Sequence, residues 1–190
     1  MLFRSVSQSR YEAGGFIKAG RSIEAGEFID ADGFIKAGGF IKAGEFIDAD
    51  GFIKAGGFIK AGESIKAGEF IDADGFIKAG GFIKAGVYIE AGESIKAGEF
   101  IDADGFIKAG GFIEAGESIE AGRYIEAGRS IEAGEFIKAG GSYGIVAGLS
   151  ITCKGTLSFG LKAFAGICSW REISEEEKTI TCGKLEGEVS

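Results

Sequence analysis

The sequence predicts an all-β fold in which a single chain winds as a triangular β-solenoid, with about 18 residues in each coil and about seven coils. Two observations lead to this prediction. Isoleucine occupies every sixth position from Ile17 through Ile137, within phrases such as E-F-I-K-A-G. The chain also contains 35 glycines and no proline, while 45% of its residues are hydrophobic. That combination favours a packed core over a disordered chain.

The six-residue period fits a strand followed by a corner, and it excludes an amphipathic helix. Isoleucines six residues apart would step around a helix and leave no apolar stripe. Each copy reads aromatic residue or serine, isoleucine, charged residue, alanine, glycine, variable residue. The first part forms a short extended segment and the last two positions form a turn. So short a segment cannot bury its own isoleucine, and the copies must therefore coil and stack on one another.

The variable position indicates how many copies complete one coil. Sorting at a period of 18 collects all but two of its glutamates in one row, whereas a period of 12 divides them evenly. This glutamate row consists of Glu27, Glu45, Glu63, Gly81, Glu99, Glu117 and Glu135. Three copies per coil explain the row, which favours a three-sided cross-section. Seven coils at the usual strand spacing give a rod about 34 Å long. The periodicity does not decide the handedness of the coil.

The aromatic position forms a second row at the same period. This aromatic row consists of Phe16, Phe34, Phe52, Phe70, Tyr88, Phe106 and Tyr124, and the serines at this position all fall in the other two rows. If its rings point outward, they form an apolar strip of the size that marks an interface. The simplest partner is the same strip on a second copy, related by a two-fold axis, which makes the protein a homodimer.

Alternation along the strand predicts which residues lie inside. Isoleucine and alanine share one face, while the aromatic and charged residues share the other. The isoleucine position never changes, whereas the aromatic position accepts serine and tyrosine, so we expect isoleucine and alanine to fill the interior. The alternative is an aromatic residue half inside a corner. At four copies aspartate replaces the glycine, and both residue types tolerate the left-handed backbone of a tight corner.

The ends of the chain depart from the repeat. We expect residues 1–10 to be an N-terminal cap, residues 11–140 the hexapeptide-repeat solenoid, and residues 141–190 a β-rich C-terminal cap or dimerisation element. Solenoids need caps because an open end presents unpaired strand edges.

The stretch A-G-E-F-I-K resembles the hexapeptide repeats of left-handed β-helices, with alanine and isoleucine in exchanged roles. The repeat is also similar to that of bactofilins, which are triangular β-solenoids. The resemblance covers about residues 11–140 and implies a fold. It implies no activity, because the hexapeptide acyltransferases use a catalytic histidine and this chain has no histidine.

Composition and motifs favour a protein that is not an enzyme and has no cofactor. The net charge of −8 argues against direct binding to nucleic acid or anionic membranes. The three cysteines, Cys153, Cys168 and Cys182, show no metal-binding or catalytic pattern and favour a cytoplasmic location. The D-A-D-G stretches that begin at Asp30, Asp48, Asp72 and Asp102 are interpreted as turns rather than metal sites. The first ten residues lack the apolar run of a signal peptide.

Two functions follow as hypotheses. A rod with a row of carboxylates could mimic nucleic acid and occupy the basic channel of a CRISPR or restriction nuclease, as a phage-encoded inhibitor would. Pentapeptide-repeat proteins that inhibit gyrase, which are acidic β-solenoids shaped like duplex DNA, offer an analogy. The alternative is a bactofilin-like scaffold that assembles end to end. The glutamates could also serve solubility alone. We expect the glutamate and aromatic rows to be the partner-binding residues.

Overall fold

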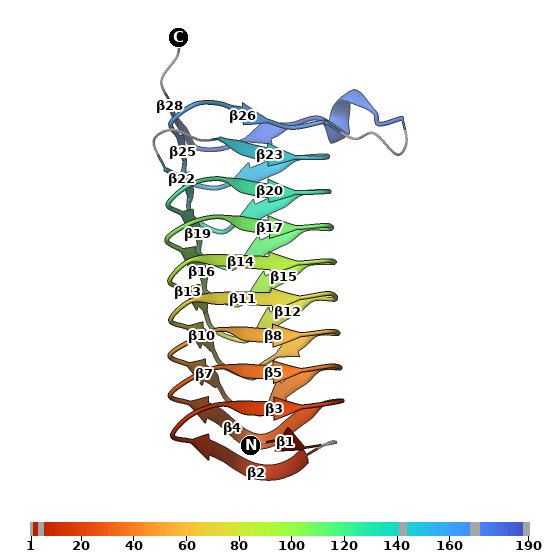
Figure 1. The fold of residues 1–190 in the computed structure, drawn as a ribbon. Coiled ribbons are helices and arrows are strands. Elements are labelled where there is room, and N and C mark those ends of the chain that lie inside the picture. Colours follow the sequence, from red (N-terminus) through yellow and green to blue (C-terminus); the bar gives the residue numbers. More distant parts are fainter. Residues whose placement is uncertain (1, 4–5, 141–143, 168–171, 188–190) are drawn as a thin grey trace.

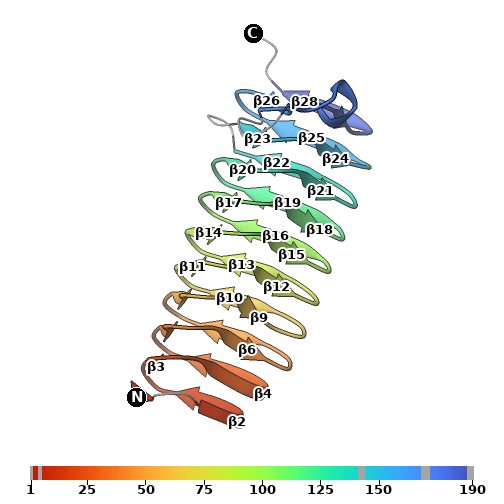
Figure 2. The same ribbon diagram turned by 90° about the vertical axis from the view of Figure 1, so that its right-hand side faces the viewer.

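The computed structural model is a parallel β-solenoid, and it describes every residue except 1, 4–5, 141–143, 168–171 and 188–190. About eight turns with about 18 residues each stack along one axis (Figures 1 and 2). Equivalent residues of successive coils pair in parallel, as Ile65 pairs with Ile47 below it and Ile83 above it. The predicted all-β solenoid and its period of about 18 residues per coil are therefore confirmed.

Each regular coil contributes one strand to each of three stacks. The first stack contains β1 (Leu2–Phe3), β3 (Ile17–Ala19), β5 (Ile35–Ala37), β8 (Ile53–Ala55), β11 (Phe70–Ala73), β14 (Tyr88–Ala91), β17 (Ile107–Ala109), β20 (Ile125–Ala127), β23 (Ile145–Ala147) and β26 (Ala163–Phe164). Two long strands, β2 (Val6–Ala13) and β4 (Ile23–Ala31), run through a corner and join the other two stacks into one sheet.

The second and third stacks both include β2 and β4 and then separate. The second continues with β6 (Ile41–Ala43), β9 (Ile59–Lys60), β12 (Ile77–Ala79), β15 (Ile95–Ala97), β18 (Ile113–Ala115), β21 (Ile131–Ala133), β24 (Ile151–Cys153) and β27 (Ile180–Thr181). The third continues with β7 (Ile47–Ala49), β10 (Ile65–Ala67), β13 (Ile83–Ala85), β16 (Phe100–Ala103), β19 (Ser118–Ala121), β22 (Ile137–Ala139), β25 (Thr156–Phe159) and β28 (Lys184–Gly187). A short 3₁₀ helix, η1 (Glu175–Glu177), interrupts the last coil.

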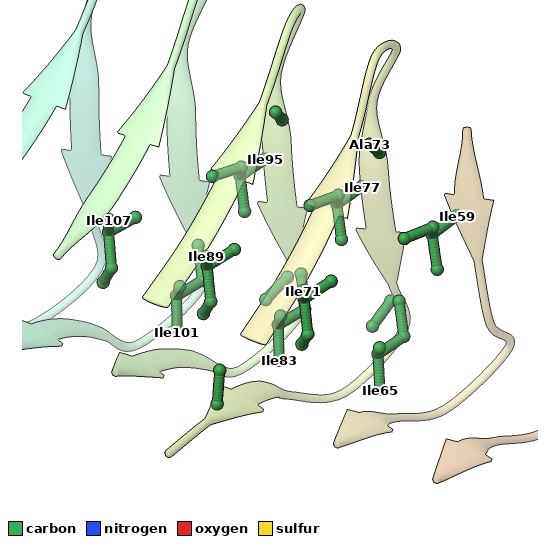
Figure 3. Packing of buried hydrophobic residues seen from close by; sticks show 14 of the residues in the cluster. Ile59, Ile65, Ile71, Ala73, Ile77, Ile83, Ile89, Ile95, Ile101 and Ile107 are labelled. Carbon is green, nitrogen blue, oxygen red and sulfur yellow. The ribbon is translucent and has the colours of Figure 1, made fainter. Parts of the chain in front are cut away.

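Isoleucine and alanine fill the interior, as the alternation predicts. From Ile23 through Ile137 every repeat isoleucine has no exposed surface, and the repeat alanines of these coils are at most 4% exposed. Figure 3 shows the isoleucines of three stacks meeting inside the coil. No charged or polar residue of the described part is buried, so hydrophobic burial supplies the main driving force for stacking.

Close contact between coils, and not left-handed backbone, explains the repeat glycines. Among the described residues only Gly166 has a positive φ, so the left-handed corner expected from glycine and aspartate is wrong. A Cβ on Gly62 would lie 1.8 Å from the carbonyl oxygen of Gly44, one coil below. Glycine is needed because the corner backbones of neighbouring coils touch.

The regular stacks continue beyond residue 140, which adds about one turn to the predicted seven. Ile125 pairs with Ile145 and Ile131 with Ile151, so this coil contains extra residues but keeps its inward positions in register. In the last coil Ile180 pairs with Ile151 across the longer excursion that carries η1. A changed coil length does not interrupt the stack as long as each strand regains its register.

Candidate binding surfaces of the solenoid

The aromatic row forms one continuous ladder of stacked rings. Neighbouring ring centroids from Phe16 to Tyr124 are 4.7–5.0 Å apart, and adjacent ring planes differ by at most 6°. This seven-ring ladder contains all the residues predicted for the row: Phe16, Phe34, Phe52, Phe70, Tyr88, Phe106 and Tyr124. Each ring lies just before the buried isoleucine of its strand, so the coil spacing sets the spacing of the rings.

The ladder lies outside the core and is half-buried. None of its rings belongs to the buried cluster, and only Phe16, at the end of the ladder, is 44% exposed. Stacking covers the flat faces of the inner rings and leaves their edges toward solvent. Partial burial raises the pKa of Tyr88 and of Tyr124 above the ordinary tyrosine value, because it disfavours the charged phenolate.

The glutamate row is also assembled by the coil. Backbone amides at this corner donate to the carbonyl one coil below, as Glu63 N donates to Glu45 O at 2.6 Å and Glu99 N to Gly81 O at 3.0 Å. The row therefore runs without a shift from Glu27 to Glu135, and Gly81 leaves one gap in its side chains.

Most carboxylates of this row have no cationic partner, unlike most acids on the flat faces. Glu27 pairs with Arg10. Within the described part of the chain the remaining members of the row, Glu45, Glu63, Glu99, Glu117 and Glu135, form no ion pair, and all are exposed. The row is thus a line of uncompensated negative charge along one corner.

The charged residues that follow each isoleucine in the chain differ from the glutamate row, because many of them form ion pairs. Lysines there pair with acids one coil away, for example Lys84 with Asp102 at 2.7 Å and Lys42 with Glu24 at 2.6 Å. Further pairs of this kind are Lys54–Asp72, Lys66–Asp48, Lys96–Glu114, Lys108–Glu126 and Lys138–Glu120. Each exposed pair contributes only about 0.2–1 kcal/mol, but together they neutralise much of the charge on the flat faces. The net negative charge is left mainly at the corners.

The D-A-D-G stretches bring carboxylates together near the N-terminal end. Asp30 lies between Glu12 and Asp48 in the stack. Partial burial raises the pKa of Asp30, and the neighbouring carboxylates of Asp48 and Asp32 raise it further. No group of three or more potential metal ligands occurs among the described residues.

Two of the cysteines lie in the last coils. Cys153 is buried at a position that alanine occupies elsewhere, and burial raises the pKa of its thiol. Cys182 is half-buried, and both thiols are free. Cys168 lies outside the described residues. A buried thiol with a raised pKa is a poor nucleophile.

Sequence reasoning missed a feature created by the serines of the aromatic position. Depressions open between coils at two of these serines, and a third, of about 350 Å³, lies at Phe34 and Phe52 without a serine. One, of about 430 Å³, is lined by residues that include Ser64, Phe82 and the row members Glu63 and Glu99; a second, of about 360 Å³, lies at Ser94. The places where serine interrupts a row of aromatic residues in the 18-residue period could have indicated the depressions at Ser64 and Ser94.

The C-terminal end of the stack was also not foreseen. Ile180 and Leu185 continue the inward columns above Ile151 and Leu157. They are 40% and 56% exposed, whereas Ile151 and Leu157 are fully buried. The last described coil therefore presents apolar side chains that would be interior anywhere else in the rod.

Comparisons with known proteins found no relative of this chain. No family model matches the sequence. No curated protein and no solved structure matches it either. Within the described residues, no helix has the length and apolar character needed to cross a membrane.

Proposed function

We propose that this protein is a non-catalytic binding protein whose glutamate row contacts a basic, nucleic-acid-binding surface of another protein. The observation that carries the proposal is the contrast between the two kinds of acid. Most acids at the charged position of the flat faces are paired with lysines, while five members of the row are exposed and unpaired within the described residues. A line of carboxylates without counter-charges is available for cations of a partner.

The dimensions of the row support a nucleic-acid-binding surface as the partner. Six coil steps from Glu27 to Glu135 span about 29 Å, compared with about 34 Å for one turn of B-DNA. The row carries about one charge per 5 Å, whereas a DNA strand carries one per 3.4 Å of axis. Basic channels that hold nucleic acid, such as those of CRISPR and restriction nucleases, are the proposed class of target.

The experiment is competition with DNA for such a nuclease. A fluorescent DNA duplex bound to the nuclease is titrated with the protein at about 50 and 200 mM salt. We expect displacement of the duplex that weakens as the salt concentration rises, because the contact is electrostatic. Glu117→Lys combined with Glu135→Lys should weaken the competition at least tenfold.

The chain offers a matched control. Glu69 and Glu93 occupy the same variable position at the other two corners and are also exposed. Glu69→Lys combined with Glu93→Lys changes the net charge by the same amount and should leave competition intact. Equal loss in both variants would show that net charge, and not the row, is responsible.

A second candidate function is a self-assembling scaffold, and the C-terminal end favours it. Exposed Ile180 and Leu185, together with the open edges of β27 and β28, form a surface that a further coil would cover. Stacking with another copy would supply that coil. Filaments in negative stain at physiological salt would support the scaffold, and particles of one rod length would contradict it.

A further inference from the structure

The aromatic position beside the glutamate row forms a third ladder, which serine interrupts at Ser64 and again at Ser118. This third ladder contains Phe28 and Phe46, then Ser64, then Phe82 and Phe100, each one coil from the next. Phe28 stacks on Phe46, and Phe82 on Phe100, with ring centroids 5.0 Å apart in both pairs. Two coil steps place the facing rings of Phe46 and Phe82 about 10 Å apart, which leaves room for one flat group between them.

The gap opens beside unpaired carboxylates. The depression at Ser64 is lined by Glu63 and Glu99 as well as by Phe82. Neither glutamate has an ion-pair partner among the described residues. Gly81, between them in the row, has no side chain to close the space. The site therefore combines the ring of Phe82 and two negative charges, and the register of the ladder places Phe46 on the other side of Ser64.

The lower end of the same ladder shows which chemical group such surroundings hold. The guanidinium carbon of Arg10 lies 4.9 Å from the centroid of the Phe28 ring. Its Nε donates a hydrogen bond to Oε2 of Glu27, the first member of the glutamate row. One arginine thus stacks on the end ring of the ladder and binds the glutamate that precedes this ring in the chain.

We propose that the gap at Ser64 is a binding site for one arginine side chain of a partner protein. The guanidinium lies between Phe46 and Phe82, about 5 Å from each ring, as Arg10 lies on Phe28. It donates to the carboxylates of Glu63 and Glu99. Arginine fits better than lysine, because its flat, delocalised cation stacks on rings and presents several donors in one plane. The inference deepens the proposed function, on which it rests, by naming the side chain of the basic partner.

The other serine gaps differ in the residues around them. At Ser94 the depression is lined by Arg129 together with a single glutamate, Glu93. A cation already at that gap disfavours a second one. The gap at Ser118 lies between Glu117 and Glu135 in the row, and it has no equivalent of Gly81. Of the gaps at Ser64, Ser94 and Ser118, the one at Ser64 therefore combines an open approach with uncompensated charge.

The test uses the intact chain and two small probes, N-acetyl-arginine amide and N-acetyl-lysine amide. Each is titrated with the protein and followed by proton NMR. We expect saturable binding of the arginine probe, with its δ-methylene signal shifted upfield by the two flanking rings, and at least tenfold weaker binding of the lysine probe. Equal binding of both probes would overturn the proposal.

Two substitutions at equivalent positions locate the site. Ser64→Phe supplies the missing ring, fills the gap and should abolish the upfield shift. Ser94→Phe fills the other depression and should leave the shift unchanged. Arginine binding that survives in the Ser64→Phe variant, or that is lost equally in both variants, would refute the site.

A milder variant separates loss of the site from a disturbed fold. Glu63→Gln retains the shape of the side chain and should weaken arginine binding about tenfold, while Glu69→Gln at another corner should not. Binding of the small probes does not depend on a DNA-binding protein, so the two proposals can fail separately. If Ser64→Phe binds the arginine probe as the parent protein does, the Ser64 site is refuted, but the proposed competition of the glutamate row with DNA is not. If the protein fails to compete with DNA but binds the arginine probe at Ser64, the proposed function is refuted and the site is not.

Discussion

A Cβ placed on Gly98 would lie 1.7 Å from the carbonyl oxygen of Gly80, one coil below. The next residues along the chain are hydrogen-bonded between the same two coils, with Glu99 N donating to Gly81 O at 3.0 Å, so neither glycine can move without disturbing a coil. We expect Gly98→Ala to destabilise the protein by about 1–3 kcal/mol, the range typical of overpacked cores. The measurement is the midpoint of urea unfolding.

The control for this prediction is Gly15→Ala. A Cβ on Gly15 has no atom within 4 Å, and its backbone lies outside the left-handed region. The change should be neutral, or stabilising by up to about 1 kcal/mol through the unfolded chain. Equal destabilisation by both variants would contradict the explanation by close contact between coils.

We expect the loss of stability on replacing an interior isoleucine by alanine to depend strongly on the position of that isoleucine along the rod. Ile83 is fully buried at mid-length, whereas Ile180 in the last coil is 40% exposed. Ile83→Ala should cost about 2–5 kcal/mol, since it leaves a cavity that neighbouring coils cannot fill. Ile180→Ala should cost about 1 kcal/mol or less. The free energy of unfolding of each variant is measured in urea. Equal losses for Ile83→Ala and Ile180→Ala would show that Ile180 is buried in solution and would contradict an exposed C-terminal end.

The carboxylate stack at Asp30 predicts a pH effect of definite sign. The folded state raises the pKa of Asp30 above its unfolded value, so the folded chain binds this proton more tightly. Protonated Asp30 is therefore compatible with the fold at low pH, and the protein loses stability as the pH rises through the folded-state pKa and Asp30 becomes charged. Asp30→Asn should stabilise the protein at pH 7 by less than about 1 kcal/mol, because the site is largely exposed.

The measurement for Asp30 is the melting temperature at pH 7 and near pH 3. The gain of Asp30→Asn over the parent protein should shrink or vanish at the lower pH, where Asp30 is protonated. Glu132→Gln, at an exposed position, serves as the control. A gain that is independent of pH would exclude repulsion among the carboxylates as its cause.

The seven-ring ladder predicts where a homodimer would form. If two copies meet along this ladder through a two-fold axis, Phe52→Ser combined with Phe70→Ser should convert the dimer to a monomer in sedimentation experiments. The matched control is Phe58→Ser with Phe76→Ser, which interrupts the ladder of Phe40, Phe58 and Phe76 on another face. A parent protein that sediments as a monomer would contradict this interface.

The glutamate and aromatic rows were predictable because both follow from period alone. Once the coil contains 18 residues, Glu45 must lie above Glu27 and Phe52 above Phe34. The ion pair between Lys84 and Asp102 follows the same period but was not predicted, because it depends on how two side chains bend toward each other across a coil. The stacking of Arg10 on Phe28 was missed for a similar reason, since Arg10 lies before the regular repeat.

By itself the sequence determined the solenoid, its coil length and its lining of isoleucine and alanine. The six-residue alternation defines one apolar face, and the 18-residue period of the glutamate row defines the stacking register. Only the tertiary structure decided why the corners require glycine, how far the aromatic rings are covered, and that the stack continues past residue 140. These properties depend on the distance between coils and on which neighbour covers each side chain. No pattern along the chain contains that distance, which arises when hydrogen-bonded strands of successive turns pack together.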